Sequence, residues 1–201
     1  MHRHDRHANH GNPDDLDAYI GKMEDPGREV WQRPDEVVSA LHVAPGDTVA
    51  DIGAGPGYFA LRLARAVGSL GTVYAVDVVP EMVAVLRERL DRAGVGNVAP
   101  ILARDGDPLL PPAACDLVLV VNTFHHFPNG PDYLKSLSAK LKPGGRIANV
   151  DFHKRETPVG PPLEHRVSRE AFLEAAREAG LALVEEKTFL PYQYFVVLRP
   201  S

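Results

Sequence analysis

The chain has little cysteine: Cys115 is the only one among 201 residues. A single cysteine cannot form an intrachain disulfide, and it cannot supply a zinc or iron–sulfur site built from several cysteines. The chain also lacks a basic excess, because 22 Lys and Arg stand against 27 Asp and Glu, which gives a formal net charge of -5. This balance argues against nucleic acid as a partner, since such binding depends on many basic contacts to phosphates.

Long apolar runs are absent as well. Residues 1–7 are too polar for a signal peptide, and no apolar run approaches the length of a membrane span. We therefore expect a cytoplasmic location without membrane insertion. The composition, 44% hydrophobic and 24% charged, is that of a folded globular protein. Residues 1–12 place four histidines among polar residues, which predicts a flexible His-rich tail, with a weak metal site as the alternative.

The remaining residues, 13–201, predict a single domain. Two short helices are expected within 13–42, where they would form a cover that precedes the core. Strands then alternate with helices through 43–151, and 152–201 add a helix and a strand pair. The expected strands are 48–52, 72–76, 98–103, 115–121, 146–151, 181–189 and 192–198. The expected helices of the core and tail are 58–67, 80–93, 132–141, which the Pro-Gly-Gly of 143–145 would end, and 168–179.

The order of these elements predicts the fold class. Strands that alternate with helices of about three turns form parallel βαβ units. The apolar run 115–121 is typical of a central strand that is covered on both faces. Only Leu190 and Pro191 separate the last two strands, which is too short for a parallel crossover. We expect an α/β, doubly wound, Rossmann-like sheet of seven strands, mostly parallel with an antiparallel C-terminal strand.

Three glycines, Gly53, Gly55 and Gly57, follow the first expected strand and precede a helix. Glycine allows a ligand to lie against bare backbone, and ligands of open α/β sheets bind at the carboxyl ends of strands. The dinucleotide fingerprint G-x-G-x-x-G needs its third glycine one residue later, where Tyr58 stands. Asp51, at the strand end, would repel a pyrophosphate and suits a cationic ligand. The loop therefore indicates a nucleotide-type site for a cationic molecule.

This loop resembles the first motif of the class I S-adenosylmethionine-dependent methyltransferases. Four further segments, 73–82, 103–107, 115–122 and 141–147, are similar to that family's later motifs in the same order. The resemblance implies S-adenosylmethionine as cofactor and S-adenosylhomocysteine as product, with acceptors like those of the ubiquinone and menaquinone methyltransferases. It implies these cofactor-binding residues: Asp51, Gly53, Ala54, Gly55, Gly57, Asp77, Val78, Met82, Asp105, Gly106 and Asn122.

Two of these acids have roles in the family that the residues themselves support. Asp77 would accept hydrogen bonds from both ribose hydroxyls, which makes two charge-assisted bonds. It stands about 20 residues after the glycine loop, where the second strand should end beside the first. Asp105 would contact the adenine amino group. The alternative for Asp77 is a helix cap before Pro80, and for Asp105 it is a simple Asp-Gly turn.

Methyl transfer requires the acceptor to be oriented in line with the reactive methyl, sometimes with a base to take its proton. The candidate catalytic residues are His125 and His126 after the fourth core strand, and Asp151 and His153 after the fifth. Their alternative is a structural role, such as packing against the cofactor. The same four residues would also supply ligands for a metal-assisted O-methyltransferase. The principal interpretation assigns no metal.

Two segments are expected to close the site. Trp31 and Arg28, just before the core, would form a substrate lid, although Trp31 could equally pack the N-terminal helices onto the sheet. Residues 153–166, which are rich in proline and glycine, form a second candidate cover.

The acceptor is expected to be a small molecule, bound by a monomer or homodimer. The fourth strand does not end in the Asn/Asp-Pro-Pro-Tyr arrangement of nucleic-acid and glutamine N-methyltransferases, and one cysteine cannot support arsenic methylation. Oxygen, nitrogen, carbon and sulfur all stay open as the acceptor atom. Two alternatives stay open: a nicotinamide-dependent oxidoreductase on the same sheet, and a non-catalytic protein that senses cofactor or metal.

Overall fold

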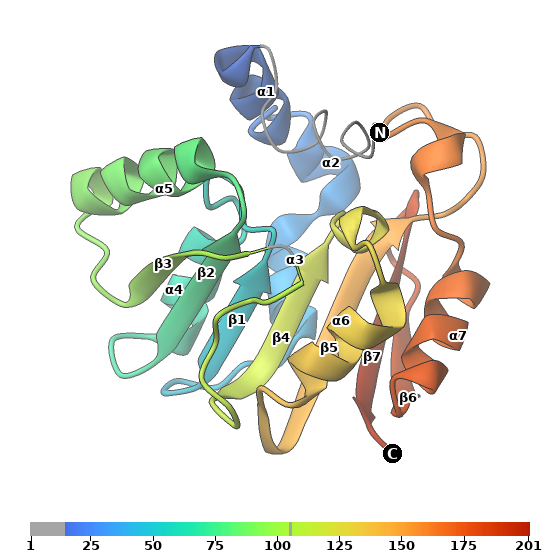
Figure 1. Cartoon of the computed structure of the whole chain (residues 1–201). Coiled ribbons are helices and arrows are strands. Elements are labelled where there is room, and N and C mark those ends of the chain that lie inside the picture. The colour runs from blue at the N-terminus through green and yellow to red at the C-terminus, as the bar shows by residue number, and fades with distance from the viewer. Residues whose placement is uncertain (1–14, 105) are drawn as a thin grey trace, which may run out of the picture.

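A seven-stranded sheet forms the centre of the computed structural model, which describes residues 15–104 and 106–201 (Figure 1). The strand order is β3-β2-β1-β4-β5-β7-β6. The first four pairings are parallel, whereas β7 is antiparallel to both β5 and β6. The predicted fold class is confirmed. The strands are β1 (Thr48–Ile52), β2 (Thr72–Asp77), β3 (Val98–Leu102), β4 (Cys115–Val121), β5 (Leu141–Phe152), β6 (Leu181–Lys187) and β7 (Gln193–Pro200).

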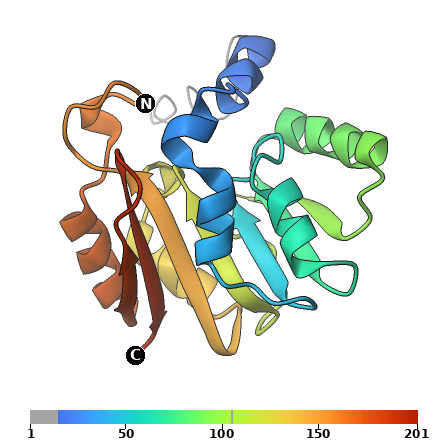
Figure 2. The ribbon, with the colours of Figure 1, turned by 180° about the vertical axis from the view of Figure 1, so that it is seen from behind.

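Helices cover both faces of the sheet. One apolar core joins α3 and α4 to the face seen in Figure 2, and a second joins α6 and α7 to the face seen in Figure 1. None of the described helices is long and apolar enough to cross a membrane. The helices are α1 (Leu16–Met23), α2 (Arg28–Gln32), α3 (Pro34–Ala40), α4 (Ala60–Val67), α5 (Pro80–Ala93), α6 (Gly130–Ser138) and α7 (Arg169–Glu178), with 3-10 turns η1 (Phe124–His126) and η2 (Leu163–His165).

Local signals set where several helices begin and end. The Asn129 side chain accepts from the backbone of Asp132 at the start of α6, and the Ser168 side chain accepts from the backbone of Ala171 at the start of α7. Gly94 takes the left-handed conformation that ends α5. These signals set the start of α6, the start of α7 and the end of α5.

Two expectations about element boundaries are wrong. The N-terminal segment holds three helices instead of two, because Arg33 is left-handed (φ 47°) and separates α2 from α3. A residue before proline is disfavoured in a helix, so Pro34 starts a new one. Helix α6 ends at Ser138, and residues 143–145 lie inside β5 instead of stopping a helix. There the β4–β5 register shifts between Cys115 and Leu117, so pairing absorbs the turn residues as an irregularity.

The strand order reverses at β1. The chain runs outward from β1 to β2 and β3, and then returns to place β4 on the other side of β1. Ligands of open α/β sheets bind at the carboxyl ends of the strands at such a point. Helices α1 and α2 lie beyond this edge of the sheet (Figure 1).

Candidate functional site

A cavity of about 860 Å³ opens at the carboxyl edge of the sheet. It lies between the ends of β1, β2 and β4 and is covered by α1, α2 and the segment before α7. The sequence-predicted residues that line it are Arg28, Trp31, Asp51, Gly53, Ala54, Gly55, Asp77, Val78, Met82, Gly106, Asn122, His125 and His126. Gly57, Asp151 and His153 do not line it. Asp105 and the His-rich tail, 1–12, lie outside the described residues.

The glycine loop and the end of β2 are bonded to each other. The Gly55 N–H donates to Asp77 Oδ2 at 2.7 Å, and the Val79 N–H donates to Oδ1 at 2.9 Å. Burial raises the pKa of Asp77, while these two N–H groups act against the shift. A carboxylate has about four lone-pair sites, so Asp77 keeps capacity to accept two hydroxyls.

Two glycines of the loop are required for different contacts. A Cβ on Gly53 (φ 73°) would lie 2.3 Å from Thr123 Oγ1, so glycine lets the end of β1 approach the end of β4. A Cβ on Gly57 (φ 95°) would lie 2.5 Å from the Leu86 side chain. Gly57 therefore packs the loop against α5 and does not face the cavity.

Among the acids that line the cavity, Asp51 has the pKa that is shifted most from its ordinary value. It is only 2% exposed, and its Oδ2 has no hydrogen-bond partner among the described residues. Burial, and secondarily the charge of Asp77, raises its pKa to about 7. A buried, unpaired carboxylate oxygen is costly. An ammonium group placed beside it would satisfy it.

Helices α1 and α2 form the roof of the cavity. The Arg28 guanidinium lies 3.9 Å from the centre of the Tyr58 ring, donates to Gln32 Oε1 at 2.9 Å and also bonds the Met23 carbonyl. Burial lowers the pKa of Arg28.

Trp31 packs on Phe152 with ring centres 5.3 Å apart. Trp31 thus both lines the cavity and packs the cover onto the sheet.

Polar contacts attach this roof to the core. Glu24, at the end of α1, is paired with Arg89 of α5. Glu29 of α2 pairs with Arg62 of α4 at 2.5 Å. The left-handed Arg33 donates to the Phe189 carbonyl at 2.8 Å.

A buried chain of three amides connects the roof to the end of β4. Gln32 Nε2 donates to Gln193 Oε1 at 3.3 Å, and Gln193 Nε2 donates to Asn122 Oδ1 at 2.7 Å. Gln32 and Gln193 are 0% and 1% exposed. Asn122 is left-handed (φ 53°), so the chain holds a strained residue that lines the cavity.

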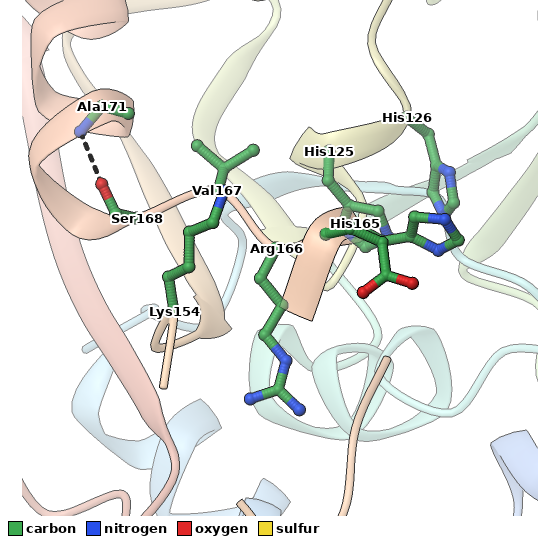
Figure 3. Close-up of a pocket in the computed structure, with 9 residues that line it drawn as sticks. His125, His126, Lys154, His165, Arg166, Val167, Ser168 and Ala171 are labelled. Carbon is green, nitrogen blue, oxygen red and sulfur yellow. Dashed lines mark hydrogen bonds between the residues drawn. The ribbon is translucent and has the colours of Figure 1, made fainter. Parts of the chain in front are cut away.

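The predicted histidines and acid gather beside the cavity. His125 Nδ1 lies 3.6 Å from Asp151 Oδ2, and the His125 and His126 rings are 4.0 Å apart. Both histidines, with His165, also line a smaller cavity of about 420 Å³ (Figure 3). His153 lies against Tyr194 outside both cavities, and burial lowers its pKa.

Residues 153–166, the cover loop, close the remaining side. Arg166 is 5% exposed, and its guanidinium donates to the carbonyls of Pro161 (2.7 Å) and Arg155 (2.7 Å), and more weakly to those of His153 (3.2 Å) and Val159 (3.4 Å). One buried cation therefore holds the loop in shape. Val159, Gly160 and Pro161 of the loop line the large cavity.

Sequence reasoning missed several lining residues. They are chiefly aromatic or come from α1: Tyr19, Lys22, Met23, Phe127, Tyr133 and Phe152. Phe127 directly follows His125 and His126, so its place in the sequence was enough to predict that it lines the cavity. No local sequence signal shows that α1 lines the cavity. Across residues 15–104 and 106–201, no group of three or more His, Cys, Asp or Glu is arranged to hold a metal ion.

Comparison with known proteins agrees with this geometry. Residues 49–145 match the family described as a methyltransferase domain. Protein-L-isoaspartate O-methyltransferase of Ignicoccus hospitalis is 36% identical over 110 residues, 54% of this chain and 49% of that protein. The ubiquinone/menaquinone biosynthesis C-methyltransferase UbiE of Laribacter hongkongensis is 33% identical over 125 residues, 62% of this chain and 50% of that protein. The crystal structure of a SAM-dependent methyltransferase from Aquifex aeolicus matches with a TM-score of 0.86 and 29% identity, covering 92% of this chain and 97% of that one.

Residues 49–145 are a methyltransferase domain, and the fold around them is similar to that of an S-adenosylmethionine-dependent methyltransferase. The cofactor of this chain is S-adenosylmethionine. The chain spans about half the length of these two curated methyltransferases.

The residues of this methyltransferase fit that cofactor. Asp77 has acceptor capacity for the ribose hydroxyls beside the bare backbone of Gly55, and the unpaired oxygen of Asp51 suits the ammonium group. When bound, the cofactor supplies an electrophilic methyl group. The protein has to hold the acceptor in line with that methyl and exclude water. The roof and the cover loop both border the cavity.

Proposed function

We propose that the protein transfers a methyl group from S-adenosylmethionine to a small-molecule acceptor. The observation that carries the proposal is the arrangement of Asp77, the glycine loop and Asp51 at the floor of a covered cavity. Asp51 and Asp77 bond no cation among the described residues 15–104 and 106–201, and two such buried carboxylates favour a ligand with ammonium and sulfonium charges, since opposite charge stabilises a buried acid. A pyrophosphate would be repelled there.

The enclosure supports a small acceptor. The roof of α1 and α2 meets the cover loop over the same cavity, which includes Trp31, Phe152 and Pro161. Cavities of this volume are typical of small-molecule sites, which are mostly apolar with few placed polar groups. The aromatic lining agrees with that pattern. The two curated relatives named above differ in acceptor, so the cavity supports the choice and their names do not.

The proposal is tested with tritium-methyl-labelled S-adenosylmethionine and a cell extract divided into a low-mass fraction and a protein fraction. We expect label in the low-mass fraction, and we expect it to be lost with Asp77→Ala. Label confined to the protein fraction would contradict the small-molecule acceptor. A thermal-shift panel on the same protein separates the nicotinamide alternative: S-adenosylhomocysteine should raise the melting temperature, while NAD and NADP should not.

A further inference from the structure

A histidine and a buried carboxylate, His125 and Asp151, lie close together beside the large cavity. His125 lies in η1, directly after β4, and Asp151 lies near the end of β5. These strands are parallel neighbours, with Val121 opposite Val150, so topology places the acid beside the turn that holds the histidine. We propose that His125, positioned by Asp151, takes a proton from the acceptor, and that the acceptor is a small phenol. This inference rests on the proposed methyl transfer.

The burial of the pair sets the orientation of the imidazole. Asp151 is 0% exposed, and its Oδ1 accepts from the Phe152 N–H at 2.8 Å. Its Oδ2 and His125 Nδ1 have no hydrogen-bond partner among the described residues, and they lie 3.6 Å apart. Catalytic hydrogen bonds are often long before substrate binds and shorten in the complex. Asp151 Oδ2 is therefore placed to accept a hydrogen bond from the Nδ1–H group of His125.

A proton fixed on Nδ1 leaves the basic lone pair on Nε2, at the opposite edge of the ring. His125 lines the large cavity and also the smaller one, which Figure 3 shows. In this proposal an acceptor in the large cavity meets the ring at the edge away from Asp151. His125 is placed as a base, and Asp151 acts through it as a positioning residue.

The aromatic residues that line the large cavity indicate the shape of the acceptor. Trp31 and Phe152 pack with ring centres 5.3 Å apart, and Phe127 and Tyr133 pack at 4.1 Å. All four side chains line the large cavity. Flat apolar walls favour an aromatic ring that stacks against them. A base in such a chamber serves an acceptor whose reacting atom carries a proton. A phenolic hydroxyl has both properties.

The step balances without a further reagent. The phenol O–H proton moves to His125 Nε2, and the oxygen bonds to the methyl carbon. The carbon–sulfur bond breaks and its electron pair stays on sulfur, which gives an aryl methyl ether and S-adenosylhomocysteine. The resulting imidazolium faces the Asp151 carboxylate and later releases its proton to water.

The first test does not depend on turnover. Histidines are labelled with nitrogen-15 and followed by NMR in the complex with S-adenosylhomocysteine, with His125→Gln to assign the signal. We expect the neutral His125 ring to carry its proton on Nδ1. In Asp151→Asn the preference for that tautomer should be lost, because the amide can accept or donate. A ring that carries its proton on Nε2 in the wild-type protein would overturn the proposal.

The second test uses phenol, catechol and 4-nitrophenol as acceptors. We expect methyl ethers, and a loss in kcat of about 10²–10⁴-fold in His125→Ala with little change in KM. Added imidazole should restore part of that activity. 4-Nitrophenol, which ionises more readily, should lose less than phenol. His42→Asn, at an exposed site with φ 49°, is the matched control and should behave as wild type.

Several results would overturn the inference. Wild-type kcat in His125→Ala would do so, and so would imidazole rescue of His126→Ala in place of His125→Ala. If none of the phenols is methylated while S-adenosylhomocysteine binds, the acceptor class is wrong and the proposed function stands. If S-adenosylhomocysteine does not bind, the proposed function itself fails.

Discussion

Replacing Asp51 with asparagine should stabilise the cofactor-free protein at neutral and higher pH, although it removes a residue of the site. Asp51 is 2% exposed, its Oδ2 has no partner among the described residues, and its pKa is raised from 3.8 to about 7. Asparagine has nearly the same shape without the charge. It can also keep the hydrogen bond that the Asp51 side chain accepts from the Ala60 backbone.

The sign and size follow from proton linkage. A carboxyl whose pKa is raised by folding binds its proton more tightly in the folded state, so ionising it costs stability. The cost is absent below pH 3.8, grows up to about pH 7 and is complete above that. One pKa unit corresponds to about 1.36 kcal/mol. The shift of about three units therefore gives about 4 kcal/mol at most, and we expect about 2–4 kcal/mol because the effective dielectric constant at buried sites is higher than that of a dry medium.

The assay is urea unfolding of the cofactor-free protein at pH 4.5 and pH 8, comparing wild type with Asp51→Asn. The variant should be more stable at pH 8, and the two should differ much less at pH 4.5. Asp91→Asn, at an exposed position of α5, is the control and should show no such difference.

The cofactor should reverse the effect. Asparagine cannot pair with the ammonium group, so S-adenosylhomocysteine should bind the variant more weakly. In the wild-type protein its affinity should rise with pH through about 7, as Asp51 ionises. A variant that is less stable than wild type at pH 8, or a difference that does not change with pH, would refute the reasoning.

Two further changes test the covers. Arg166→Met leaves carbonyls of the cover loop without a donor, so we expect the free energy of unfolding in urea to fall by about 3 kcal/mol. Trypsin should also cleave faster within 153–166. Unchanged cleavage would contradict the role of Arg166 in holding the loop. Gln193→Leu removes the partner of Gln32 Nε2 and of Asn122 Oδ1, which should cost about 1–3 kcal/mol and weaken binding of S-adenosylhomocysteine in calorimetry. Equal stability would show that the amide chain contributes nothing.

The floor of the site was predictable because it follows from strand order. Asp51 and Asp77 lie near the ends of neighbouring parallel strands, with Ile52 opposite Val76. The carboxyl ends of such strands meet at one edge of the sheet. Two strands recognised from their apolar pattern are therefore enough to place both acids together.

The roof was not predictable in the same way. Met23 lies over Gly55, its sulfur 3.0 Å from where a Cβ would stand, and its helix is attached through the Glu24–Arg89 pair. These partners are 65 residues apart in the sequence. Amphipathic pattern and caps describe a helix locally, but such long-range contacts decide where it docks. The use of Trp31 in both lining and packing depends on the same docking.

Local signals also failed where pairing overrode them. The Pro-Gly-Gly of 143–145 is a strong turn signal, yet β5 begins at Leu141 because that residue already pairs with Cys115. The motifs at the ends of β4 and β5 pointed to His125 and Asp151 separately. Their contact depends on side-chain direction at those strand ends, which no periodicity encodes.

Calorimetric titration with S-adenosylhomocysteine tests the central claim most directly, that the glycine loop and Asp77 hold the adenosyl group. Wild type should bind with a micromolar Kd. Loss of two charge-assisted bonds in Asp77→Ala should weaken binding at least about 100-fold, whereas Glu81→Ala, at an exposed position on α5, should not. The absence of binding to wild type, or equal affinity in Asp77→Ala, would contradict the account.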